Sequence, residues 1–182
     1  MIQFYKPNSK NTGSACSFWL SPKDNRFYAC IIKQDSWNAA KRTGSFAQNA
    51  ENPEKKVVVK FSDVEIGGIL DAIDSNRGFS AYHDGATTQF STSLKFEPYM
   101  REGSQVGFSF MVTKSSKEDT TKKISFVIGL SFPEARLLKE HLSFLLNKSF
   151  AIEAESYKQN PKNNESSAQE SGHPTEATDI EL

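Results

Sequence analysis

The stretch KFSDVEIGGILDAI, residues 60–73, and the stretch GLSFPEARLLKEHL, residues 129–142, decide the fold because they are two copies of one helix entrance. In each copy an apolar run leads to a serine, and a glutamate follows three residues later. This spacing is a capping box, in which the serine oxygen accepts a backbone N–H and the glutamate reaches back to the cap. The capping residues are Ser62 with Glu65 and Ser131 with Glu134.

The two copies also share an apolar stripe. When they are aligned on the serines, three isoleucines of the first copy match three apolar residues of the second at i, i+3 and i+7, which is one face of a helix. The matched pairs are Ile66 with Ala135, Ile69 with Leu138 and Ile73 with Leu142. In the first copy, the Gly67-Gly68 pair is expected to let the two helices approach closely, or to be a simple imperfection. Gly78 is expected to end that helix in a left-handed conformation.

The rest of the first 150 residues reads as strands, because apolar and polar residues alternate between turn signals. The loop-like stretch 40–55 precedes the last strand of the first half, and Asp84-Gly85 is a hairpin signal. We therefore predict an α+β fold with two four-stranded antiparallel sheets, each followed by a helix, as a β4α-β4α duplication. The predicted strands are residues 2–6, 14–20, 27–37 and 56–61, then 79–83, 87–99, 106–113 and 124–130.

The net charge of zero hides a division along the chain. Residues 151–182 carry seven acidic and two basic side chains, a net charge of −5, which leaves 20 basic and 15 acidic side chains, or +5, in residues 1–150. We predict one domain over 1–150, with internal repeats 1–77 and 78–150, and a disordered acidic tail over 151–182. The tip of the tail is either a docking motif for a partner protein or a solubilising end; its residues are Asp179, Ile180, Glu181 and Leu182.

The residues that could support catalysis are scattered. The three histidines share no motif, and the sequence has no phosphate-binding glycine loop, nucleophile elbow or paired metal ligands. Cys16 and Cys30 are expected to be buried free thiols, which favours a reducing intracellular compartment. We expect no enzymatic activity, no metal, no cofactor and no membrane segment. The histidines are His83, His141 and His173.

Aromatic and basic residues are interleaved on the polar faces of the predicted strands. Rings on an open sheet stack with unpaired bases at about 1–3 kcal/mol each, and lysines neutralise phosphates. A tryptophan that closes the edge of the core is the alternative for either of the two tryptophans. The candidate nucleic-acid-binding residues are Trp19, Lys33, Trp37, Lys41, Arg42, Lys55, Lys56, Lys60, Lys95 and Tyr99.

The doubled layout, with the entrances FSDVEIGGIL and LSFPEARLL, resembles the Whirly family of single-stranded DNA-binding proteins. Half of it is similar to the positive cofactor four domain, in which one such unit dimerises. The resemblance covers residues 1–150. It implies two sheets packed crosswise, single-stranded DNA bound along their edges with little sequence preference, and assembly through the helices into a dimer or tetramer.

The acidic tail is similar in logic to the tails of bacterial single-stranded DNA-binding proteins, which recruit replication and repair enzymes. We therefore expect a non-enzymatic single-stranded DNA-binding protein in replication, recombination or repair. It would act in the cytoplasm or nucleoid, or in the host cytoplasm if a phage encodes it. An RNA-binding protein or transcription cofactor on the same scaffold is the first alternative, and a protein-interaction module is the second.

Overall fold

The computed structural model describes residues 1–85, 88–119 and 121–159. In the first half, an antiparallel sheet with strand order β1-β2-β3-β6 (the first sheet) precedes helix α1. Its elements are β1 (Ile2–Lys6), β2 (Ser14–Ser21), β3 (Arg26–Lys33), β6 (Lys56–Phe61) and α1 (Asp63–Ser75). In the second half, an antiparallel sheet with order β10-β9-β8-β7 (the second sheet) precedes helix α2. Its elements are β7 (Phe79–His83), β8 (Phe90–Arg101), β9 (Ser104–Ser116), β10 (Lys123–Ser131) and α2 (Phe132–Gln159).

A two-stranded sheet is added to this plan and corrects the prediction of one long strand over 27–37. After β3 the chain leaves the first sheet and forms a hairpin of β4 (Ser36–Asn38) and β5 (Thr43–Ser45), followed by a 3-10 turn, η1 (Ala47–Asn49). The buried side chain of Gln34 holds the chain where the predicted strand is interrupted. Its Nε2 donates to the carbonyl of Ser36 (2.9 Å), and its Oε1 accepts from the backbone N–H of Asn8 (2.9 Å).

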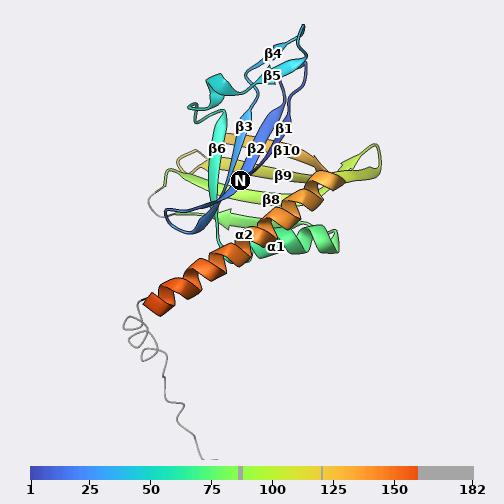
Figure 1. Ribbon diagram of the computed structural model, residues 1–182. Coiled ribbons are helices and arrows are strands. Elements are labelled where there is room, and N and C mark those ends of the chain that lie inside the picture. The colour runs from blue at the N-terminus through green and yellow to red at the C-terminus, as the bar shows by residue number, and fades with distance from the viewer. Residues whose placement is uncertain (86–87, 120, 160–182) are drawn as a thin grey trace, which may run out of the picture.

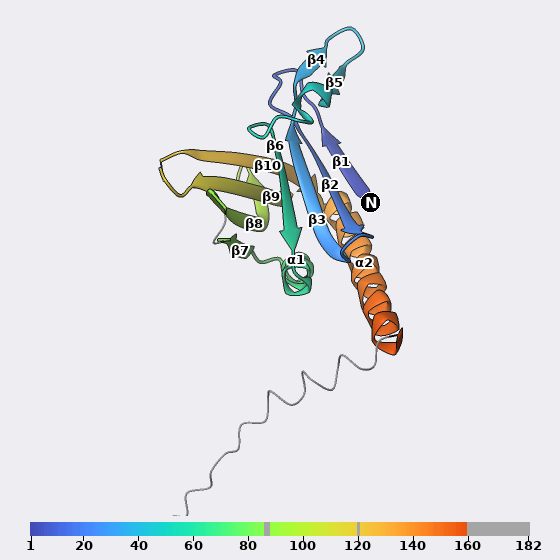
Figure 2. The same ribbon diagram turned by 90° about the vertical axis from the view of Figure 1, so that its left-hand side faces the viewer.

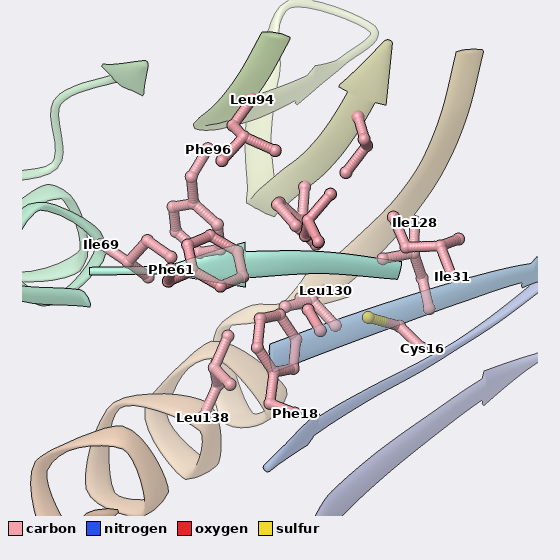
Figure 3. Packing of buried hydrophobic residues seen from close by; sticks show 14 of the residues in the cluster. Cys16, Phe18, Ile31, Phe61, Ile69, Leu94, Phe96, Ile128, Leu130 and Leu138 are labelled. Carbon is pink, nitrogen blue, oxygen red and sulfur yellow. The ribbon is translucent and has the colours of Figure 1, made fainter. Parts of the chain in front are cut away.

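The strands of the two sheets run crosswise, and α1 and α2 lie side by side at the end opposite the β4–β5 hairpin (Figures 1 and 2). Each sheet turns one face toward the core (Figure 3). Phe110 of the second sheet lies 5.4 Å from Phe18 and 6.1 Å from Phe61 of the first sheet, measured between ring centroids. Ile69 and Leu138 close the core from the helices. Neither half could bury its apolar face alone.

The predicted helix entrances are present. Ser62 Oγ accepts from the N–H of Glu65 (3.3 Å), and Glu65 Oε2 accepts from the N–H of Ser62 (2.8 Å), which completes the first capping box. At the second entrance only the glutamate half of the capping box forms: Glu134 Oε2 accepts from the N–H (2.8 Å) and the hydroxyl (2.7 Å) of Ser131. The predicted apolar stripes face the core, and Ile73 is partly buried against it.

Three local predictions need correction. Asn76, with φ 55°, ends α1 in the left-handed conformation expected of Gly78. Gly68 makes room for a strand residue rather than for α2, since an added Cβ would lie 2.3 Å from the ring of Phe79. Strands β7 and β8 pair on either side of Asp84-Gly85, as the hairpin signal predicts, but β8 begins at Phe90 rather than at residue 87.

Helix α2 continues to Gln159, so residues 151–159 are helical and do not belong to a disordered tail. Just before this segment, Ser149 is fully buried, and the Asn25 amide in the β2–β3 turn donates to its hydroxyl (3.0 Å), which holds α2 against the first sheet at this point. The rest of the predicted tail, with Asp179, Ile180, Glu181 and Leu182, lies outside the described residues. Within the described ranges, no helix has the length and apolar character needed to cross a membrane.

Candidate nucleic-acid interface

The outer face of the first sheet, which points away from the core, is a grid of cross-strand rows. Strand alternation sends Phe27, Ala29 and Ile31 inward, and the residues between them outward. The antiparallel register then aligns the outward residues across the strands. One row is Trp19, Tyr28 and Lys60; the second is Gln3, Ser17, Cys30 and Val58; the third is Tyr5, Ala15, Ile32 and Lys56.

The row of Trp19, Tyr28 and Lys60 combines stacking rings with a cation. Trp19 and Tyr28 are both half-buried and stack, with centroids 5.7 Å apart and planes inclined by 17°. The Lys60 ammonium lies 6.0 Å from the Tyr28 centroid. Trp19 therefore points to the non-core side of its strand, as the alternation predicts.

A carboxylate stands at the end of this row. Asp24 Oδ2 accepts from the Tyr28 hydroxyl (2.7 Å) and lies 3.3 Å from Lys60 Nζ. Hydrogen bonds from Ser21 and Tyr28, together with Lys60, lower the pKa of Asp24 to about 2. The carboxylate is thus ionised at neutral pH and partly neutralises the one cation in the row.

The outer face is hollowed along its length. One concavity of about 530 Å³ is bordered by Trp19, Leu20 and Val58. A second, of about 250 Å³, lies under Phe46 and Tyr5. Both are lined by Ser17, Cys30 and Ile32, so they form one shallow groove from Trp19 to the base of the β4–β5 hairpin.

The β4–β5 hairpin carries the second group of predicted residues. Trp37 is half-buried and pairs with Gly44, while Lys41 and Arg42 are exposed in the connecting turn. The hairpin projects from the body beyond the end of the first sheet (Figure 1). Its base is held by Asp35, which accepts from the Ser45 hydroxyl (3.2 Å) and the Gln48 N–H (2.7 Å).

The second sheet carries the last predicted residues on its own outer face. Lys95 is exposed and lies 3.4 Å from Glu97. Tyr99 is 43% exposed, and its ring lies against Gly129, where an added Cβ would come within 3.3 Å of it. These residues are on a different sheet from Trp19 and Trp37, so the ten predicted residues fall into three areas rather than one surface.

The predicted cations differ in how they are paired. Within the ranges the structure describes, Lys33, Lys41, Arg42 and Lys55 make no ion pair, and all four lie in or beside the hairpin. Lys60 and Lys95 are each paired with a carboxylate, and Lys56 lies 4.0 Å from Glu51. Among the predicted cations, the unpaired ones therefore lie at the hairpin end of the first sheet.

Sequence reasoning missed several residues of these surfaces. Tyr28 and Tyr5 belong to the outer face of the first sheet, and Tyr82, 64% exposed, belongs to that of the second. The alternation in FYACIIK sends Tyr28 to the face of the sheet opposite that of Phe27. This pattern could therefore have identified Tyr28 as a residue of the outer face. Lys114 lies within β9, one residue beyond the predicted strand 106–113, and was not among the candidate residues.

Comparison with known proteins bears on the fold. No protein-family model matches the sequence, and no curated protein matches it significantly. Among solved structures, WHY1 from Arabidopsis thaliana aligns over 97% of this chain and 96% of its own, with a TM-score of 0.59 and 16% identity. WHY3 from the same plant aligns over 86% of this chain and 93% of its own, with a TM-score of 0.58 and 18% identity.

A third structure, described as the plant transcriptional regulator PBF-2, aligns over 88% of this chain and 87% of its own, with a TM-score of 0.56 and 16% identity. All three are plant proteins, so they lend no support to the option of a phage origin. At this level of identity the likeness concerns the fold, and the resemblance inferred from the two capped helices is confirmed: the chain has the Whirly fold.

Proposed function

We propose that this protein binds single-stranded DNA without catalysing a reaction and with little sequence preference. The observation that carries the proposal is the outer face of the first sheet. There, Trp19 stacks on Tyr28 at one end of a groove that Lys56 also lines, and the hairpin that carries Lys41 and Arg42 projects beyond the other end. Unpaired bases stack on such rings, while the cations neutralise phosphates.

Weak sequence preference follows from the chemistry of this surface. A ring accepts the face of any base, and an ammonium contacts phosphates that are identical in every nucleotide. A duplex reader instead needs a helix free to enter the major groove. The apolar side of α1 is buried, and its exposed side presents Asp71, which would repel phosphates, and Asp74, which is paired with Lys139 of α2.

The proposal includes self-association through the helices. Leu137 is 58% and Phe144 63% exposed on α2, and they are two turns apart on one side of the helix. Covering these side chains in a second copy would remove apolar area from water. Light scattering should give a mass above the monomer, and Phe144→Glu should lower it; a monomeric wild-type protein would contradict this part of the proposal.

Roles in replication, recombination or repair, and recruitment of partners by the acidic tail, belong to the same proposal. The description of PBF-2 as a transcriptional regulator favours a second candidate, a nucleic-acid-binding cofactor in transcription. The surface does not distinguish DNA from RNA, because stacking and ion pairing do not depend on the 2′-hydroxyl.

The decisive experiment is a titration with oligo-dT at low salt, followed by the fluorescence of the two tryptophans and by anisotropy of labelled DNA. We expect quenching and a dissociation constant that rises steeply with salt. A duplex of equal length should bind more weakly, and oligo-U of matched length tests the RNA alternative. Absence of binding to oligo-dT at low salt would refute the proposal.

A further inference from the structure

Four lysines meet where the first sheet passes the second, and we call them the junction lysines: Lys33, Lys55, Lys56 and Lys114. Lys33 follows Ile31 on the inward side of β3, and Lys114 follows Val112 on the inward side of β9. Since Ile31 and Val112 are fully buried, these two lysines stand where the core opens to solvent. The Lys33 ammonium lies 4.8 Å from the centroid of the Phe126 ring in the second sheet.

The other two junction lysines are Lys56, the first residue of β6, and Lys55, which directly precedes it. The N–H of Lys33 donates to the carbonyl of Lys55 (2.8 Å), so these two residues are neighbours. Lys56 and Lys114 line the same concavity of about 310 Å³, together with Asn52, although they belong to different sheets. Lys56 and Lys114 therefore share one concavity that is open to solvent, and Lys33 and Lys55 lie beside it, at the adjoining ends of β3 and β6.

This place has little negative charge to balance it. Among the described residues, Lys33, Lys55 and Lys114 form no ion pair, and the only acid lining the concavity is Glu51, 4.0 Å from Lys56. Burial, and then the charge of Lys55, lower the pKa of Lys33. Like charges held together destabilise the folded chain, and a bound polyanion would offset that repulsion.

We propose that the junction lysines bind phosphate groups of a polyanion and, on the proposed function above, guide the DNA backbone from the first sheet to the second. Lys56 ends the row of Tyr5, Ala15 and Ile32 at the β6 edge of the first sheet. A single strand of DNA that follows this row would leave the first sheet at Lys56. The next cation that it would meet is Lys114 of the second sheet. A competing account is that the lysine stems only cover the end of the core.

The test compares wild-type protein with the double variant Lys56→Gln/Lys114→Gln in oligo-dT titrations over a series of salt concentrations. Each phosphate contact contributes about 0.7 to the slope of log K against log salt. Losing two contacts should therefore reduce the slope by about 1.4. An unchanged slope in the double variant, with oligo-dT still bound, would overturn the proposal and leave the proposed function standing.

Controls separate charge from fold and position. Lys148→Gln removes an exposed charge from α2, distant in the fold, and should leave the slope as in wild type. Lys114→Arg keeps the charge and should keep the salt slope. If Lys114→Arg reduced the slope as much as Lys114→Gln does, phosphate binding by Lys114 would be contradicted. Glutamine retains most of each stem, and thermal unfolding of every variant reports on the fold.

Inorganic tripolyphosphate distinguishes the two possible sources of phosphate. If tripolyphosphate binds wild type and binds the double variant more weakly, while oligo-dT binds neither, the phosphate site stands and the proposed function fails. Equal binding of tripolyphosphate to both proteins would count against the site.

Discussion

Trp19 and Tyr28 stack on the outer face of the first sheet, with ring centroids 5.7 Å apart and planes inclined by 17°. The antiparallel register makes them directly opposite on β2 and β3, so the two rings form one aromatic platform. Trp19 also borders the open groove, so on the proposed function this platform is where an unpaired base would stack.

Replacing Trp19 with alanine should weaken binding of oligo-dT by about 1–3 kcal/mol, the usual value of one base–aromatic stack. The salt slope should stay unchanged, because no phosphate contact is lost. Anisotropy titrations at several salt concentrations check both statements. Tyr157→Ala, which removes an exposed ring from the far end of α2, is the matched control; equal effects of the two substitutions would refute a role for the platform.

Asp24→Asn should strengthen binding of oligo-dT at low salt. The change removes the ionised carboxylate beside Lys60 and frees that ammonium for a phosphate, while the amide can still accept from the Tyr28 hydroxyl. Titrations in low and high salt should show the gain fading as salt rises. Adding Lys60→Gln should cancel the gain; if the gain persists, Lys60 is not its source.

The two adjacent glycines of α1 should respond to alanine in opposite ways. At Gly67 nothing lies within 4 Å of an added Cβ, so Gly67→Ala should stabilise the fold by about 1 kcal/mol through helix propensity. At Gly68 the Cβ would collide with Phe79, so Gly68→Ala should destabilise it. Chemical denaturation measures the free energy of unfolding of both variants. Stabilisation by Gly68→Ala would show that Phe79 moves aside easily.

Deleting residues 160–182 should raise the affinity for oligo-dT at low salt. This segment carries five acidic residues and one basic residue, a net charge of −4, which competes with phosphate for the cations of the body. Cutting after Gln159 keeps α2 whole, unlike the boundary at 150 that we expected from composition. Anisotropy titrations of both chains provide the comparison, and lower affinity in the shortened chain would exclude masking.

Much of the fold was predictable because its signals are local. The Ser-x-x-Glu spacing at Ser62 and Ser131 depends on neighbouring backbone N–H groups, and strand alternation depends on a period of two. The outward position of Trp19 followed from that alternation. By contrast, the break after β3 comes from Gln34, whose amide contacts Asn8, a residue distant in the sequence. A contact between residues so far apart in the sequence leaves no periodic pattern from which it could be predicted.

The sequence by itself determined the twice-used sheet-and-helix unit and the residue types on its polar faces. Only the tertiary structure decided which of them act together. It paired Trp19 with Tyr28, neutralised Lys60 with Asp24, and brought Lys56 to Lys114 of the other sheet. The physical reason is that alternation assigns a residue to a face, whereas its neighbours on that face are set by strand register and by how the two sheets cross.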